Sequence, residues 1–353
     1  MKKCYINGIS CISAQPTFEN KIPGEAENEK AAVLYAVQPS YKDLIPPAAG
    51  RRMAKGVKMG IYTSHYALKE AGTEEPEVII IGSGMGCMED SEKFLSAILD
   101  NDEQFLTPTS FIQSTHNTVG GQIALGLGCK GYNFTYVNGS VSFESALADS
   151  CMQLKAGEIE TALTGGVDET APRTLELLTL NGTITTVPDQ KEIKAPDNTG
   201  VIYGEGAGCF VIENIKKPSS YAEIAGIEMI NDLLPDEVGS FIRSFLERNG
   251  SSPEEIDLII LGNNGNIQDE PFYQAAEELF PAASRACYKH LSGEYPTASV
   301  YALWSACHIL KEKSIPAGMQ VAEAKGNAVQ QLLLYNQNGG TEHSLILLKN
   351  VEA

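Results

Sequence analysis

The sequence lacks long hydrophobic segments and has few positive charges. Unbroken apolar runs such as Val78–Ile81 are far shorter than the roughly 20 residues that a membrane helix needs. The chain of 353 residues has a formal net charge of −19, which argues against nucleic acid as a partner. We therefore expect neither a membrane span nor a nucleic-acid interface.

Cysteine pairs and a signal peptide are also missing. The eight cysteines are scattered, with no CxxC pair and no histidine at zinc-finger spacing. This pattern predicts free thiols in a reducing compartment, with no metal site. Lys2 and Lys3 lead directly into a strand-like pattern instead of the apolar core of a signal peptide. We expect a cytoplasmic protein.

The residues that are present indicate a large α/β protein. Hydrophobic residues make up 43% of the chain and charged residues 20%, which is ordinary globular usage. The length suits two domains or one large double-layered domain. Strand patterns fall at 3–9, 77–82, 133–137 and 161–167, and helix patterns at 51–71, 90–99, 120–127 and 141–156. This alternation predicts a mainly parallel sheet covered on both faces.

The second half of the chain repeats this order of elements. The echoes are strands at 222–227, 256–262 and 345–349, and helices at 235–249 and 299–313. We interpret the halves, 1–213 and 214–353, as two copies of one α/β unit. The alternative is that any α/β protein shows such echoes. The segments 16–47 and 181–200 are polar and rich in Pro or acidic residues, and are expected to be loops.

Four short motifs resemble one family in their order along the chain. They are Arg51-Arg52-Met53, Ile81-Gly-Ser-Gly-Met-Gly86, Thr161-Ala-Leu-Thr-Gly-Gly-Val-Asp168 and Tyr203-Gly-Glu-Gly-Ala-Gly208. Together they are similar to the β-ketoacyl-acyl carrier protein synthases. The resemblance implies a thiolase-like fold, with five layers αβαβα built from a duplicated βαβαβαββ unit.

The resemblance also implies where the catalytic side chains would lie. Family members use a cysteine at the start of a buried helix and two histidines that promote decarboxylation of a malonyl extender. The matching positions here carry Ser140, Asn264 and Glu294. Lys289 matches a lysine of the family motif that ends in the second histidine. A hydroxyl is far less acidic than a thiol, and an amide accepts no proton at neutral pH, so we expect condensing activity to be lost.

Each replaced position also has a plain structural interpretation. Ser140 could cap the helix at 141–156, because serine is a favoured N-cap. Glu294 could be a capping or hydrogen-bonding residue, and Lys289 a structural partner of Glu294 or of a backbone carbonyl. The stretch Gln337-Asn-Gly-Gly-Thr341 resembles the family's gate motif, which places the gate position at Asn336.

A basic run stands out in this acidic sequence. Arg51, Arg52, Lys55 and Lys58 lie at the start of the predicted helix at 51–71, which would put three of them on one face. By resemblance, this region docks an acidic acyl carrier protein. The alternative is an ordinary solvated helix face.

We predict a synthase-like subunit without condensing activity of its own. It would resemble the chain-length factors that pair with an active ketosynthase in fatty acid, polyketide or polyene synthesis. The strand at 133–137 would form a homodimer or heterodimer across a two-fold axis. Two alternatives remain: an acyltransferase or thioester hydrolase that uses Ser140, and a working 3-oxoacyl synthase with a divergent site. We expect no cofactor, because the family's substrate is carried on the phosphopantetheine of the carrier protein.

Overall fold

The N-terminal half of the chain forms five adjacent strands. The structure is a computed structural model that describes residues 2–22, 31–185, 199–322 and 329–351. The strand order is β1 (Tyr5–Ile12), β7 (Gly206–Glu213), β5 (Thr161–Asp168), β3 (Val78–Gly82) and β4 (Tyr132–Tyr136). The first two pairings are antiparallel and the last two are parallel.

The C-terminal half repeats this order and these directions. It consists of β8 (Ala222–Asn231), β13 (Glu342–Lys349), β12 (Gln331–Asn338), β9 (Leu258–Leu261) and β10 (Ser284–Cys287), with β11 (Gln320–Ala322) added at the edge. Again two antiparallel pairings are followed by two parallel ones. The predicted duplication of one α/β unit is confirmed. The boundary between 213 and 214 falls in the connection from β7 to β8, and its role as a domain border stays a prediction.

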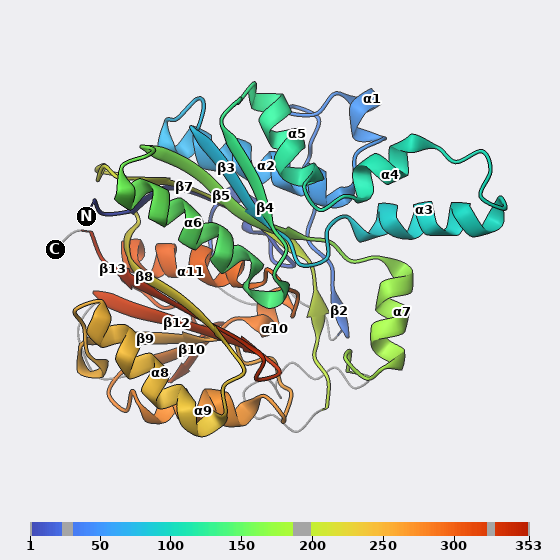
Figure 1. Ribbon diagram of the computed structural model, residues 1–353. Coiled ribbons are helices and arrows are strands. Elements are labelled where there is room, and N and C mark those ends of the chain that lie inside the picture. Colours follow the sequence, from blue (N-terminus) through green and yellow to red (C-terminus); the bar gives the residue numbers. More distant parts are fainter. Residues whose placement is uncertain (1, 23–30, 186–198, 323–328, 352–353) are drawn as a thin grey trace.

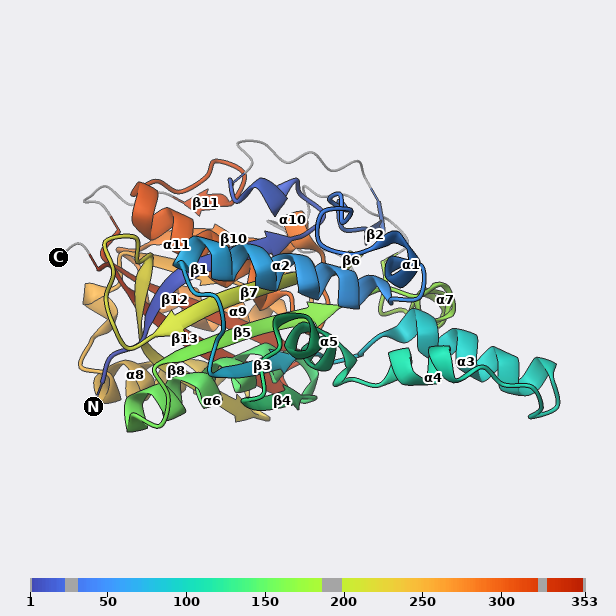
Figure 2. The same ribbon diagram turned by 90° about the horizontal axis from the view of Figure 1, so that it is seen from above.

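Helices cover the strands in layers (Figures 1 and 2). The two central helices, α6 (Ser142–Ala156) and α11 (Ser299–Glu312), lie between the strand layers. The outer helices are α2 (Lys55–Ala71) and α5 (Thr118–Leu127) on one side, and α8 (Pro235–Arg248) and α9 (Glu270–Glu278) on the other. This is the predicted αβαβα arrangement.

The core contains most of the residues of the two central helices. Phe143 of α6 and Trp304 of α11 are fully buried in a cluster that includes residues of both strand layers. Strands β3 and β9 consist of Ile, Leu and Val apart from the final Gly82 of β3, and every residue is buried, as expected where helices cover both faces. β1 also pairs with β8 at Tyr5 and Ile6, which joins the two layers into one sheet.

The predicted helix at 51–71 is wrong at its start. Residues 51–53 form a turn after the short helix α1 (Pro47–Gly50), and α2 begins only at Lys55. Ala54 has extended backbone angles, so the basic residues before it lie outside the helix. Of the predicted loops at 16–47 and 181–200, the parts at 23–30 and 186–198 lie outside the described residues.

An arm projects from the body of the protein between β3 and β4. It consists of α3 (Met88–Asp100) and α4 (Pro108–Ser114), which pack along each other beyond the strand layers (Figures 1 and 2). Further short elements are β2 (Val33–Leu34), which pairs with β6 (Tyr203–Gly204), and the helices α7 (Pro172–Leu180) and α10 (Lys289–Ser292). Within the described residues, every helix is too short or too polar to cross a membrane.

Candidate functional site

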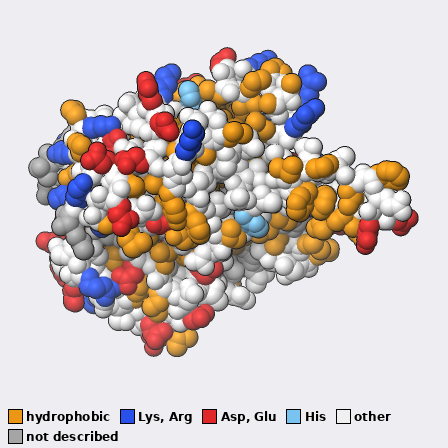
Figure 3. Space-filling model, turned by 45° about the horizontal axis from the view of Figure 1, so that its top comes forward, with side chains coloured by type: hydrophobic (Ala, Val, Ile, Leu, Met, Phe, Trp, Pro, Cys, Tyr) orange, Lys and Arg blue, Asp and Glu red, His pale blue; other side chains and the backbone are white. Residues whose placement is uncertain are grey.

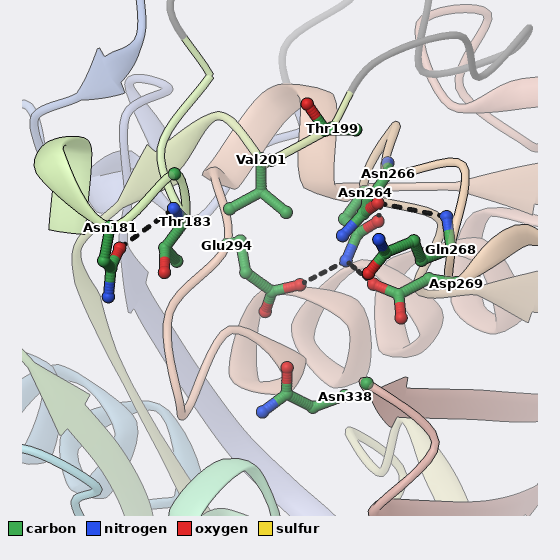
Figure 4. Close-up of a pocket in the computed structure, with 13 residues that line it drawn as sticks. Asn181, Thr183, Thr199, Val201, Asn264, Asn266, Gln268, Asp269, Glu294 and Asn338 are labelled. Atoms are coloured by element: carbon green, nitrogen blue, oxygen red, sulfur yellow. Dashed lines mark hydrogen bonds between the residues drawn. The ribbon is translucent and has the colours of Figure 1, made fainter.

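A polar cavity of about 500 Å³ lies where loops of the two halves meet (Figure 4). One wall comes from residues around the end of α7 and the segment before β6, and the other from the loop after β9 and the β12–β13 turn. The lining residues are Asn181, Gly182, Thr183, Thr199, Gly200, Val201, Asn264, Asn266, Gln268, Asp269, Glu294, Asn338 and Gly339. No cysteine or histidine is among them, and the only charged residues are two acids.

The amide of Asn264 lies between these two acids. Its Nδ2 donates hydrogen bonds to Asp269 Oδ2 at 2.8 Å and to Glu294 Oε2 at 3.1 Å (Figure 4). Its Oδ1 accepts from the backbone N–H of Asn266 at 3.0 Å, which holds the loop after β9 in place. Both amide atoms are therefore occupied, and Asn264 is fixed as a bridge between carboxylates.

Lys289 provides the positive charge for this cluster. Its Nζ donates to Glu294 Oε2 at 2.6 Å, and the two side chains are 1% and 12% exposed. Of the two partners expected for Lys289, Glu294 and a backbone carbonyl, the structure shows the ion pair with Glu294. Among the described residues at this cavity, the ammonium of Lys289 is bound to Glu294, so Asp269 adds a negative charge that no described cation pairs with.

The glycine-rich motif after residue 200 holds Glu294 in position. The N–H of Glu294 donates to Ile202 O at 2.8 Å, and its carbonyl accepts from Gly204 N at 2.9 Å. A Cβ on Gly204 would lie 2.2 Å from the carbonyl oxygen of Ser292, so only glycine allows this approach. The Tyr203-to-Gly208 motif, on which the resemblance rests, therefore positions the turn that carries Glu294.

Ser140 lies at the start of α6 but does not cap it. The N-cap residue of α6 is Val141, and Ser140 belongs to the preceding 3-10 turn, Gly139–Val141. The Ser140 Oγ donates to Glu342 Oε2 at 2.5 Å, and its backbone N–H donates to the same oxygen at 2.8 Å. The predicted capping role is wrong, because the hydroxyl is bound to a carboxylate from β13.

Besides Glu342, a second acid, Glu144, lies near Ser140, in the first turn of α6. Glu144 is fully buried, and burial raises the pKa of its carboxyl above the usual range. Its Oε1 accepts a hydrogen bond from Ser344 Oγ at 3.0 Å. Glu144 is thus a polar core residue whose hydrogen bond to Ser344 ties α6 to β13.

The basic run does not form one helix face. Arg51 and Arg52 are exposed in the turn before α2. Lys55, in contrast, forms an ion pair of 2.5 Å with Glu205, which is buried and also accepts hydrogen bonds from the N–H and Oγ of Thr170. Lys55 thus stabilises the Tyr203-to-Gly208 motif, and the predicted face of Arg51, Lys55 and Lys58 is wrong.

Two site residues were not found from the sequence. Asp269 follows Asn264 by five residues, and Glu342 directly follows the Gly-Gly-Thr motif that the resemblance had found. The position of Glu342 next to that motif could have indicated that its carboxylate belongs to the site. The gate position at Asn336 is also not at the cavity: Asn336 is buried with its Oδ1 facing Tyr288 OH, whereas Asn338 lines the cavity.

Comparisons with known sequences identify relatives of this chain. Residues 6–217 match the family model "Beta-ketoacyl synthase, N-terminal domain". The chain is 23% identical over 365 residues to 3-oxoacyl-[acyl-carrier-protein] synthase 2 of Staphylococcus aureus (strain COL), covering 89% of this chain and 87% of that protein. It is 25% identical over 240 residues to nodulation protein E of Rhizobium leguminosarum bv. trifolii, covering 62% of this chain and 58% of that protein.

Solved structures share the fold over almost the entire chain. The ishigamide ketosynthase/chain length factor superposes with a TM-score of 0.81 at 18% identity, covering 99% of both chains. A type II PKS acyl-carrier protein in complex with its ketosynthase bound to the hexaketide gives a TM-score of 0.76 at 14% identity, again covering 99% of both chains. At these identities the likeness concerns the fold alone.

Proposed function

Because the chain belongs to the β-ketoacyl synthase family, we propose that it is a non-condensing subunit that assembles with an active ketosynthase. This proposal rests on the side chains at the three positions that match the family's catalytic residues, each of which is bound to another side chain of the protein. Ser140 is bound to Glu342, Asn264 bridges two acids, and Glu294 is paired with Lys289. Every one of these groups already has a structural partner.

The charge of the cavity supports the loss of condensation. In the family reaction a malonyl group loses its carboxylate as CO₂, and the enolate that forms is also negative. Asp269 and Glu294 line the cavity, and Lys289 is already paired with Glu294. Like charges in a partly buried site repel strongly, so this cavity disfavours both the malonyl anion and its enolate.

The edge of the first strand layer supports an assembly with a second chain. β4 is the last strand of the sheet, and among the described residues only β3 pairs with it. Its aromatic side chains Tyr132 and Phe134 stack on each other and are 45% and 43% exposed. An unpaired edge with exposed aromatic residues is a place where another strand can add.

The arm of α3 and α4 presents a second apolar surface (Figure 3). Its exposed hydrophobic residues are Leu95, Leu99, Phe105, Phe111 and Ile112. Phe105, near the tip of the arm, is 91% exposed, which is unfavourable for a side chain of this size in a free monomer. We infer that a partner subunit of the same fold covers the arm together with the β4 edge.

The remaining basic residues support docking of a carrier protein. Arg51 and Arg52 are exposed next to the start of α2, and Lys58 is half-buried on its first turn. Acyl carrier proteins are acidic, and exposed guanidinium groups attract such a surface at low salt. Lys55 is paired with the buried Glu205, so we propose that it stabilises the fold and does not bind the carrier protein directly.

Co-purification with a ketosynthase tests the proposal. The tagged protein is co-expressed with a ketosynthase that retains its Cys-His-His set, and the complex is isolated by affinity and size-exclusion chromatography. We expect a stable pair and no mass increase on Ser140 after incubation with acyl carrier protein. An acyl adduct that disappears in Ser140→Ala would instead support an acyltransferase that uses this serine.

A further inference from the structure

The Glu342 carboxylate lies directly against Ser140 at the start of α6. Its Oε2 accepts one hydrogen bond from the Ser140 hydroxyl and one from the Ser140 N–H, at 2.5 Å and 2.8 Å. Backbone N–H groups at a helix start have no partner within the helix, and the helix dipole favours negative charge there. Glu342 is therefore an anion that the C-terminal half supplies to the 3-10 turn Gly139–Val141, which leads into α6.

Gly139 leaves room for this carboxylate. Its φ is +52°, a left-handed conformation that glycine adopts without steric cost. A Cβ at this position would lie 2.1 Å from Glu342 Oε1, so a side chain here would displace the carboxylate. Glycine at position 139 thus permits both the left-handed backbone and the close approach of the Glu342 carboxylate.

The charge of Glu342 is not neutralised by its neighbours. Among the described residues, no ion pair includes Glu342. Its strand partners are the neutral residues Asn231 on β8 and Asn338 on β12. The following His343 is buried, and burial lowers the pKa of its imidazole, so it is neutral at physiological pH. In the part of the chain that the structure describes, no cation therefore offsets the charge of Glu342 beside Ser140.

We propose that Glu342 is an internal anion that blocks covalent chemistry at position 140. It occupies the N–H that would otherwise hold the oxygen of an acyl group on this side chain. Its charge also opposes the negative charge that develops on nucleophile and carbonyl oxygen during acyl transfer. This inference rests on the proposed function, for which it supplies a cause: restoring a cysteine alone does not restore a reactive nucleophile.

Alkylation of an introduced cysteine tests this. In Ser140→Cys the thiol lies at a helix start, which normally favours the reactive thiolate. With Glu342 in place, we expect slow reaction with iodoacetamide at pH 7.5. In Ser140→Cys/Glu342→Gln, which keeps the shape and removes the charge, we expect a rate about tenfold higher or more, since one pKa unit changes the thiolate fraction about tenfold. The pH–rate profile should shift to lower pH by the same amount.

Controls separate this effect from general changes in the protein. Ser140→Cys/Glu228→Gln removes a carboxylate on the neighbouring strand β8, which pairs with Arg248 rather than Ser140, and should react like Ser140→Cys. Peptide mapping assigns the label to position 140 among the native cysteines. If the Gln variant does not fold, Glu342→Ala in the same background gives the same comparison.

Equal rates and equal pH profiles for the single and double variants would overturn this inference. That result would leave the proposed function standing, because it concerns only the cause of inactivity at position 140. Condensation by the unmodified protein would overturn the proposed function instead.

Discussion

The ammonium of Lys289 lies 2.6 Å from the carboxylate of Glu294, and this ion pair is buried beside the polar cavity. The resemblance predicts that both groups lie in the family's catalytic region, and here they form an ion pair. The pair also fixes Glu294 as an acceptor for Asn264, 3.1 Å away. One ion pair thus holds both side chains and the Asn264 amide in place.

Removing one partner of this pair should destabilise the protein. In Lys289→Met the Glu294 carboxylate stays buried without its cation, and we expect a loss of about 3 kcal/mol in the free energy of unfolding. Urea unfolding of the purified variant measures this. Lys289→Met/Glu294→Gln removes both charges and should regain most of the loss. A double variant as unstable as the single one would show that packing, and not charge, dominates.

Stability should also depend on the ionisation of Glu169. Burial raises the pKa of this carboxyl to about 7 from 4.5. The folded state therefore binds more protons than the unfolded state between these values, and stability falls as pH rises from about 5 to 7. Between pH 5 and pH 7, we expect the free energy of unfolding to fall by about 1–3 kcal/mol less in Glu169→Gln than in the unmodified protein.

Unfolding at pH 5 and pH 7 measures that difference. Glu169 accepts hydrogen bonds from the N–H groups of Gly56 and Glu89, so the variant loses stability at both pH values, and only the change with pH counts. Other buried acids such as Asp168 are present in both proteins and cancel in the comparison. The same pH dependence in both proteins would contradict the prediction.

The exposed edge of β4 should be required for assembly. Phe134→Asp places a charge on the aromatic surface of this strand, and we expect the complex with a ketosynthase, or the homodimer, to dissociate to monomers. Light scattering after size-exclusion chromatography measures the mass. Ile215→Asp, at another exposed hydrophobic residue, should leave the assembly intact. An unchanged mass for Phe134→Asp would place the interface elsewhere.

Arg51 and Lys55 should respond differently to charge reversal. Arg51→Glu/Arg52→Glu changes exposed residues, so we expect weaker carrier binding at low salt with unchanged thermal stability. Lys55→Glu places a second acid beside the buried Glu205 and should lower stability. Binding by fluorescence anisotropy and melting curves separate the two effects. Lys130→Glu/Lys313→Glu supplies the same charge change elsewhere, and equal weakening by it would argue for non-specific attraction.

Most of the fold could be predicted from the sequence, because strong local patterns coincide with buried elements. The apolar runs at β3 and β9 and the long helices α6 and α8 were all found. Strand β10 was not found, since Ser284–Cys287 has little strand preference and is buried only through its neighbours. The start of α2 was misplaced because the charged residues before Ala54 continue a helix-like pattern without a break.

The site could be predicted only in part, because its contacts join distant segments. Lys289 and Glu294 are five residues apart, and their pairing was foreseen. Ser140 and Glu342 are 202 residues apart, and no local pattern connects them. Serine capping was the plausible local interpretation of Ser140. Only the antiparallel turn between β12 and β13, placed against α6, brings the carboxylate to it.

A condensation assay tests the central claim most directly. The purified protein is incubated with malonyl and acyl carrier protein, alone and after addition of the partner ketosynthase, and the 3-oxoacyl product is measured by mass spectrometry. We predict no product from this protein alone and product only when the ketosynthase is present. Formation of 3-oxoacyl product by this protein alone, absent in Ser140→Ala, would contradict the account.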